Sequence, residues 1–351
     1  MNILIFNIIF SIVESILFFS AKKKRAIDRF IYCILIFIQC FILHAFLNPF
    51  TMEDLPGYIE TFELFSKNSL EHSIFIGYAG VKMEIGWTIL CKLLSLISNN
   101  YRILLIFTSL IMVGSYVYSI KKYSPIIWLA VLIYLCTVYD QSLFVLRQHT
   151  AMAICLLSIP SIAKRDLKVF LLFYILAISI HMTAIVFGVV YPLAGMKLNR
   201  RFWIILLLIT IILTITSSVF FNWFFANTWY NSYEDKEGSN YTGFLIALST
   251  LLLYLYSINW NTNSIQIVEK CFLSLAIIAV VISFIGAGFS PTNRLIKYFT
   301  ISSIFLIPIS ISNLKHPSNK CLITCIVVCL YTILFFSRSN LHYIENYQLF
   351  L

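Results

Sequence analysis

The stretch IILLLITIILTI at residues 204–215 has no charged side chain and does not alternate apolar with polar residues. Comparable runs recur along the chain, which is 60% hydrophobic and 11% charged, whereas soluble domains carry about 25% charged residues. A transmembrane β-barrel would need that alternation, while a helix satisfies every backbone polar group within its own segment. The sequence therefore predicts an all-α polytopic integral membrane protein, with residues 1–351 as a single membrane domain.

Apolar segments of about 20 residues, the length that crosses roughly 30 Å of hydrocarbon as a helix, predict about twelve spans. We place them at residues 2–20, 30–47, 102–120, 125–139, 143–162, 168–180, 182–194, 202–221, 243–258, 270–287, 298–312 and 321–337. The basic run at residues 22–25 directly follows the first span, so the positive-inside rule places the N-terminus on the outer side of the membrane. Alternation from there puts most of the 25 Lys and Arg residues in the cytoplasm and the C-terminus outside. We expect the first span to be kept rather than cleaved as a signal peptide.

Residues 168–194 are too long for one span and carry basic residues before and after them. Because both ends then belong in the cytoplasm, the segment must go out and return. We predict two short helices, at residues 168–180 and 182–194, that meet at His181 near the outer face. Each would be about 20 Å long at 1.5 Å per residue.

Two outer loops are larger than a connection requires, and most acidic residues lie on this side. The first, residues 48–101, contains a weakly apolar helix at residues 88–98 that we expect to lie in the membrane interface or to re-enter. The second, residues 222–242, interleaves Trp, Tyr and Phe with Asn and acids. These rings either form an interfacial aromatic belt or stack on sugars, which present apolar C–H faces and polar edges.

Neither the nine cysteines nor the net charge of +10 predicts a separate function. Nearly all the cysteines fall in apolar segments, so no disulfide or zinc framework is expected. Cys321, Cys325 and Cys329 share one helix face, and we interpret them as packing residues. The positive charge lies in the cytoplasmic loops, which is typical of a membrane protein rather than of a nucleic-acid-binding protein.

Arg147 lies about two turns inside its predicted span, where burial costs about 2.5 kcal/mol or more unless a partner or a water-filled cavity receives the guanidinium. Asp140 is two turns earlier on the same helix face, so a structural ion pair is one explanation. The other is that Arg147 holds an anion that comes and goes. Ala151, Cys155 and Ser158 continue this face as small residues, which would allow close and rigid packing beside it.

His181 stands alone in an apolar segment, where an ionisable group indicates function more often than in a soluble core. Imidazole has an ordinary pKa of about 6.5, which suits proton transfer; a packing role is the alternative. Glu14, in the first span, either hydrogen-bonds a neighbouring helix or takes part in function. Arg294 and Lys297 break the shortage of positive charge on the outer side and are placed for an anion.

The order of these residues resembles the EpsG family, which is among the Wzy-like bacterial polysaccharide polymerases. An outer Asp-x-x-x-Tyr is followed by Glu-x-Gly, by Arg-Gln in a small-residue helix, by Ala-x-x-x-His and by a late Arg-x-x-x-Tyr. The matching positions are Asp54 and Tyr58, Glu84 and Gly86, Arg147 and Gln148, Ala177 and His181, and Arg294 and Tyr298. The motifs are short, so their order and their side of the membrane carry the resemblance, which covers most of the chain. Ile180 departs from the Phe that usually precedes the family's histidine.

The resemblance implies a GT-C-like or Wzy-like helical bundle in the bacterial cytoplasmic (inner) membrane. Its activity would be a glycosyl transfer on the outer face, joining oligosaccharide units carried on undecaprenyl diphosphate into a capsule, exopolysaccharide or O-antigen chain. The lipid diphosphate already activates the donor, so no metal, cofactor or nucleotide sugar is expected. The implied partners are the lipid-linked oligosaccharide, the bilayer, a chain-length regulator and a flippase, with no nucleic acid.

The residue types also fit this chemistry independently. Arginine binds diphosphate bidentately, and an attacking sugar hydroxyl needs a proton acceptor. The residues expected to hold the diphosphate are Arg147, Arg294 and Lys297. The candidate bases, among which the sequence does not choose, are His181, Asp54 and Glu84. The residues expected to contact the substrate are Tyr58, Gln148, Asp140 and Tyr298.

Two rival classes stay open beside the polymerase: a flippase or other transporter of the lipid-linked unit, and a membrane acyltransferase. A flippase also has about twelve spans, but it needs neither a large outer loop nor a histidine at the outer face. An acyltransferase usually places Asp, Asn or Arg next to its intramembrane histidine, and His181 has none of these adjacent. The polymerase is the favoured hypothesis.

Overall fold

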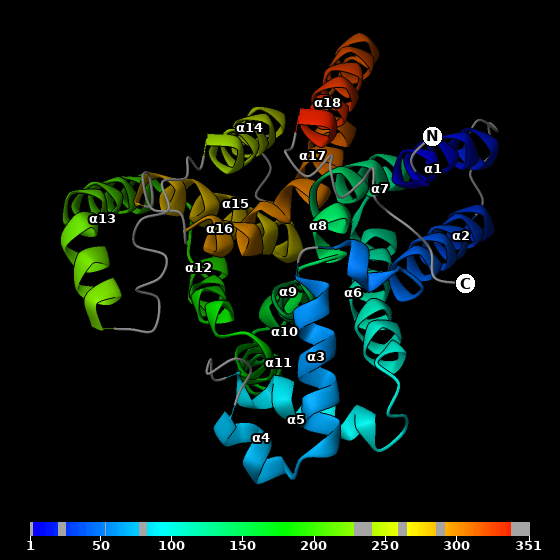
Figure 1. Ribbon diagram of the computed structural model, residues 1–351. Coiled ribbons are helices and arrows are strands. Elements are labelled where there is room, and N and C mark those ends of the chain that lie inside the picture. Colours follow the sequence, from blue (N-terminus) through cyan, green and yellow to red (C-terminus); the bar gives the residue numbers. More distant parts are fainter. Residues whose placement is uncertain are drawn as a thin grey trace. The chain divides into compact units, whose positions relative to one another are not determined.

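The computed structural model describes residues 3–19, 26–52, 54–76, 83–227, 241–258, 265–285 and 292–337, and every regular element within these ranges is helical (Figure 1). The predicted all-α class is therefore confirmed. The basic run at residues 22–25, most of the second outer loop and residues 338–351 lie outside the described ranges. The chain folds as two compact units.

The first unit comprises Met1–Ser158, Leu171–Ala184 and Leu314–Leu351. Its helices are α1 (Ile3–Phe19), α2 (Ala26–Ala45), η1 (Pro49–Thr51), α3 (Leu55–Lys67), α4 (Leu70–Ile76), α5 (Ile85–Ser95), α6 (Arg102–Tyr123), α7 (Ile127–Tyr134), the π-helical η2 (Leu135–Tyr139), α8 (Asp140–Ser142), α9 (Leu146–Leu157), most of α11 (Leu167–Ile180) and α18 (Pro317–Ser337). α6 lies at the centre of this unit, because it packs along both α2 and α9. The buried rings of Tyr116 and Tyr134 stack with centroids 4.8 Å apart and join α6 to α7.

The second unit comprises Ile159–Phe170 and Ile185–Asn313. Its helices are α10 (Ile159–Ala163), most of the 3-10 helix η3 (Met182–Val189), α12 (Val190–Ala194), α13 (Arg200–Asn227), α14 (Tyr241–Ser257), α15 (Ile267–Ile285), α16 (Thr292–Thr300) and α17 (Ser302–Asn313). α15 contacts α12, α14 and α16, and α14 contacts α17. Phe272 and Phe305 stack at 4.2 Å in the core of this unit.

A helix or a pair of short helices lies over each of the twelve predicted spans. Among the described residues, six helical segments are long and apolar enough to cross a membrane: Ala26–Ala45, Arg102–Tyr123, Arg200–Ser217, Ile267–Ile285, Thr292–Asn313 and Pro317–Ser337. Several predicted bounds were wrong. The span at residues 143–162 divides at Ser158 into α9 and α10, and the span at residues 298–312 begins already at Thr292.

The segment around His181 divides as predicted. α11 ends at Ile180 and η3 begins at Met182, so His181 belongs to neither helix. The second half starts as a 3-10 helix rather than an α-helix.

The two ends of this segment contact each other, which shows that the chain turns back on itself. The Tyr191 hydroxyl donates to the Arg165 carbonyl at 2.8 Å, and the Tyr191 ring stacks on Phe170 at 4.9 Å. Arg165 adopts φ 58°, and its guanidinium lies 4.2 Å from the Tyr191 ring. A Cβ on Gly195 would lie 2.9 Å from the Arg165 Cζ, so a side chain there would displace the arginine.

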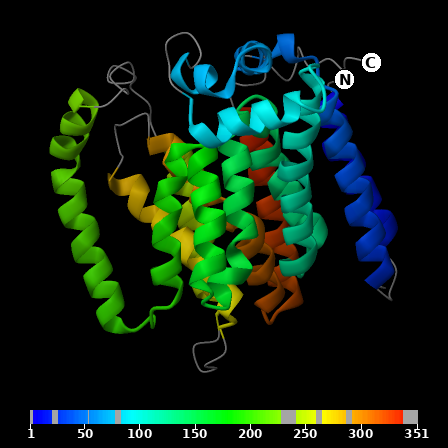
Figure 2. The ribbon, with the colours of Figure 1, turned by 90° about the horizontal axis from the view of Figure 1, so that it is seen from below.

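The described part of the predicted first outer loop is folded rather than extended. Its predicted helix at residues 88–98 is α5, which begins three residues earlier at Ile85, and α3 and α4 pack beside it. The Lys92 ammonium on α5 donates to the carbonyls of Phe65 and Ser66 at 3.2 Å each and of Asn68 at 2.7 Å, and so caps the C-terminus of α3. Figure 2 shows α5, in cyan, running crosswise to α6 and meeting one end of it.

The described cysteines are free thiols. Six are buried, whereas Cys321, Cys325 and Cys329, which we interpreted as packing residues, are exposed on α18. α18 buries only a small part of its surface within the unit, and its remaining faces are apolar. Such faces suit contact with lipid, where cysteine behaves as a small hydrophobic residue.

Candidate active site

Glu84 joins three distant segments of the first unit. It is the residue before α5, and its Oε2 forms an ion pair with Nη1 of Arg147 on α9. Its Oε1 lies 3.0 Å from Nδ1 of His181 and accepts the Met182 backbone N–H at 3.1 Å. The three side chains are mostly buried, with 19% of Glu84, 21% of Arg147 and 9% of His181 exposed. One carboxylate therefore holds a cation on one oxygen and an imidazole on the other.

Gly86 explains the spacing of the Glu-x-Gly motif. A Cβ on Gly86 would lie 2.6 Å from the Ser179 carbonyl oxygen, closer than real side-chain contacts allow. The first turn of α5 therefore rests directly on the last turn of α11, next to His181. Without this close backbone approach, Glu84 could not reach His181 and Met182 together.

Arg147 is the second residue of α9, and aromatic rings lie beside it. Its Cζ is 5.7 Å from the centroid of the Tyr58 ring on α3, and Tyr58 in turn meets Trp87 edge to face at 5.7 Å. Trp87 is fully buried, whereas Tyr58 is partly exposed. A guanidinium over an aromatic face gains cation–π stabilisation, so α3 and α5 together position Arg147.

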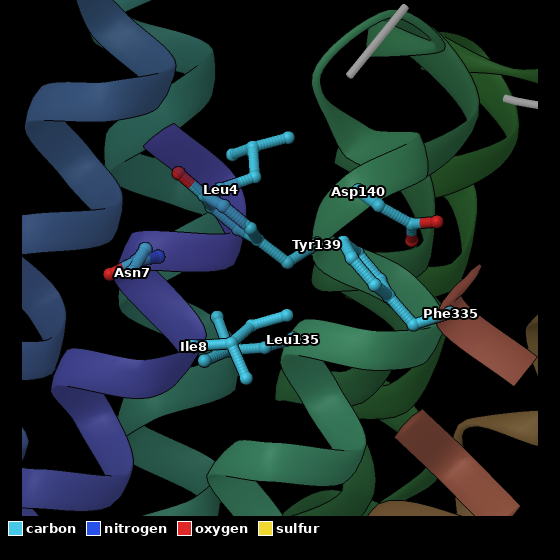
Figure 3. A pocket seen from close by; sticks show the side chains of 7 residues that line it. All are labelled: Leu4, Asn7, Ile8, Leu135, Tyr139, Asp140 and Phe335. Carbon is cyan, nitrogen blue, oxygen red and sulfur yellow. The ribbon is translucent and has the colours of Figure 1, made fainter. Parts of the chain in front are cut away.

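The ion pair of Arg147 is thus with Glu84, and the predicted alternative of a pair with Asp140 was wrong. The prediction assumed a continuous helix, in which residues seven apart share a face. The chain instead leaves the helical path between α8 and α9, at residues 143–145, so the two side chains are not on one face. Asp140 lines a small pocket together with Leu4, Asn7, Ile8, Leu135, Tyr139 and Phe335 (Figure 3).

The Glu84 carboxylate is held ionised. Burial alone would raise its pKa, but the hydrogen bond from His181 and the charge of Arg147 outweigh burial and lower the pKa to about 2. A carboxylate only accepts hydrogen bonds, so Nδ1 of His181 must carry a hydrogen and donate the hydrogen bond to Glu84. Nε2 is then the ring nitrogen that can take up a proton. A strongly acidic Glu84 is poorly suited to be a base, whereas His181 is oriented for that role.

The other predicted site residues lie at varying distances from this cluster. Asp54 is exposed, directly precedes α3 and lies one turn before Tyr58 of that helix. Gln148 follows Arg147 and is buried. Three more residues, all on α16 in the second unit, are Arg294, Lys297 and Tyr298. The first two are partly exposed, and Tyr298 is fully buried.

Glu14 hydrogen-bonds a neighbouring helix, which was one of its two predicted roles. Gln39 Nε2 of α2 donates to its Oε1 at 2.6 Å. Sequence reasoning did not identify Trp87 or His44. Trp87 directly follows the Glu-x-Gly motif, and this position was the available signal; His44 ends an apolar span and carried none.

A comparison with known families supports the resemblance. The model of the EpsG family matches residues 29–350 of the chain. No curated protein matches significantly, and neither does any solved structure.

Proposed function

Because this chain belongs to the EpsG family, whose members are membrane proteins of the polysaccharide-polymerase type, we propose that it joins oligosaccharide repeat units into a longer glycan. The proposed donor is an oligosaccharide on undecaprenyl diphosphate, and the proposed place is the outer face of the bacterial cytoplasmic membrane. The product would be a capsule, an exopolysaccharide or an O-antigen. A flippase would supply the donor, and a chain-length regulator would act with the enzyme.

The observation that carries the proposal is the shared carboxylate of Glu84. Arg147 forms an ion pair with one of its oxygens, and His181 hydrogen-bonds the other. The proposed diphosphate-binding cation and the proposed proton acceptor therefore lie side by side. Transfer of a sugar from a diphosphate needs this pair of groups. A flippase moves its substrate unchanged and needs no base to deprotonate an attacking hydroxyl.

In the proposed reaction, the acceptor hydroxyl attacks the anomeric carbon of the donor. A new C–O bond forms there, and the bond from that carbon to the diphosphate oxygen breaks. The hydroxyl proton passes to Nε2 of His181, and the diphosphate leaves with its negative charge against the Arg147 guanidinium. No atom of Glu84 enters the reaction.

Glu84 is proposed as the positioning residue of the pair. It fixes the tautomer of His181 through Nδ1 and stabilises the imidazolium that forms, which is the task of the carboxylate in a Ser-His-Asp triad. It also neutralises Arg147 before the donor arrives. A guanidinium has five N–H donors, so Arg147 can bind a diphosphate while part of it still faces Glu84.

The remaining residues have proposed binding roles. Tyr58 and Gln148, next to Arg147, would contact the donor, and Asp140 would act from the pocket beside α1. Asp54, exposed just before α3, would face the acceptor sugar. Arg294 and Lys297 on α16 are proposed to bind the diphosphate, and Tyr298 on the same helix is proposed to contact the substrate.

The test replaces His181 in cells that lack the chromosomal gene. His181→Ala and His181→Gln should both leave lipid-linked single units exposed on the outer face, with no long chains. Gln can replace a hydrogen bond but cannot take up a proton in this pH range. Glycan length would be read on gels, and outer exposure by an impermeant lectin.

Two outcomes would contradict the proposal in different ways. Long chains from His181→Gln would reduce His181 to a positioning residue. Units trapped on the inner face would favour a flippase and exclude the polymerase.

A further inference from the structure

The chain breaks its helical path just before Arg147, and this break decides where the guanidinium lies. α8 ends at Ser142, and α9 begins at Leu146. Within the break, the Gln141 carbonyl accepts both the Phe144 N–H at 3.3 Å and the Val145 N–H at 3.1 Å. Because Arg147 comes one residue after α9 begins, any change in the angle of the break moves Arg147 directly.

His44 holds the Ser142 carbonyl at this break. It lies in the last turn of α2 and has no exposed surface. Its Nε2 is 2.9 Å from the Ser142 oxygen, and its Nδ1 is 2.7 Å from the Ser109 hydroxyl on α6. A carbonyl only accepts, so Nε2 must carry the proton. His44 therefore supplies from another helix the donor that a continuous helix would supply itself.

Further hydrogen bonds hold the end of α2 on both sides of His44. The Tyr139 hydroxyl donates to the Cys40 carbonyl at 2.8 Å, which gives α2 a second hydrogen bond to the chain before the break. Arg102 donates to the carbonyls of Ala45 at 3.2 Å and Leu47 at 2.9 Å and so caps the end of α2. A side chain held this rigidly can hold the break rigidly.

We propose that His44 is a positioning residue for Arg147: its hydrogen bond to Ser142 fixes the break between α8 and α9 and thereby aims the guanidinium at the lipid diphosphate. The inference rests on the proposed function, because it takes Arg147 as the group that binds the donor's diphosphate. His44 itself touches no substrate. Loss of its N–H leaves a buried carbonyl without a donor, and the break must then relax to find another.

The test measures binding of undecaprenyl diphosphate to the full-length protein in lipid nanodiscs. His44→Phe keeps an aromatic ring of similar shape but cannot donate, and we expect binding to weaken about tenfold. His44→Gln can still donate to Ser142, and its binding should stay within about twofold of the wild type, clearly tighter than that of His44→Phe. Rescue by Gln is the result that a packing role would not produce, since Phe resembles the histidine ring more closely.

A second arm shows whether the effect passes through Arg147. In an Arg147→Ala background, His44→Phe should weaken binding no further, because no guanidinium is left to aim. Independent effects that add would overturn the inference. If His44→Phe fails to accumulate, Ser109→Ala, which frees the ring from α6, should weaken binding about threefold in the wild-type background and not in the Arg147→Ala background.

The arms also separate this inference from the proposed function. If Arg147→Ala binds undecaprenyl diphosphate as tightly as the wild type, the proposed function fails. If Arg147→Ala binds weakly while His44→Phe binds normally, only the role of His44 is wrong.

Discussion

Arg147 holds its charge in a largely buried place because one oxygen of Glu84 pairs with it and the face of Tyr58 lies beside it. Lysine would keep the charge but lose the planar fork that binds carboxylate and phosphate bidentately. We therefore expect Arg147→Lys, like Arg147→Ala, to abolish long chains while the protein still accumulates in the membrane. Glycan length and protein amount in membranes would be measured together. Full chain length from Arg147→Lys would mean that only a point charge is needed.

Glu84 has a pKa near 2 in the folded protein, well below the ordinary carboxyl value. A lowered pKa adds stability that is present above the unfolded value, about 4.5, and is lost as the pH falls towards 2. The thermal midpoint of the purified protein should therefore drop more between pH 6 and pH 3 in the wild type than in Glu84→Gln. Glu84→Gln should also cost roughly 100-fold in polymerisation rate at pH 7, since His181 and Arg147 lose their shared anion. The matched control is Glu63→Gln, an exposed carboxylate on α3 that should change neither reading.

At the scale of elements, the site depends on the contact between α5 and α11. Gly86→Ala would place a methyl group 2.6 Å from the Ser179 carbonyl, so the two helices must separate. We expect a cost of about 1–3 kcal/mol in stability and a loss of chain length, because Glu84 moves away from His181. Gly114→Ala on α6 is the control: its Cβ would meet only Phe37, at an ordinary 3.7 Å, and should be neutral or stabilising. A Gly86→Ala protein with normal stability and chain length would show that the contact is not needed.

The elements themselves were largely predictable, and the contacts between them were not. Hydropathy and basic residues placed a helix over each span and the division at His181, since both depend on local composition. The break at residues 143–145 contains no Pro or Gly to announce it, so Asp140 was wrongly considered as the partner of Arg147. Glu84 can be the partner of Arg147 and His181 because Gly86 packs against Ser179. This contact joins segments about 90 residues apart, and no local sequence pattern reveals it.

At the scale of the whole molecule, the proposed function requires the first outer loop to lie outside the cell, and this sidedness rests on the positive-inside rule. Single cysteines can test it. Ser69, exposed between α3 and α4, should label with an impermeant maleimide in intact cells, and so should Glu237, which lies outside the described residues. Lys122, exposed at the end of α6, should label only after the membrane is opened, as should Lys23, also outside the described residues.

The native cysteines should give little background in this experiment. Six of the nine are buried, and the three exposed ones lie on the apolar surface of α18, where a thiolate would be poorly solvated. The protein without an added cysteine is the control. Labelling of Lys122→Cys in intact cells, with Ser69→Cys protected, would reverse the orientation. The site formed by Glu84, Arg147 and His181 would then face the cytoplasm instead of the outer side of the membrane. The polymerase proposal would have to be abandoned.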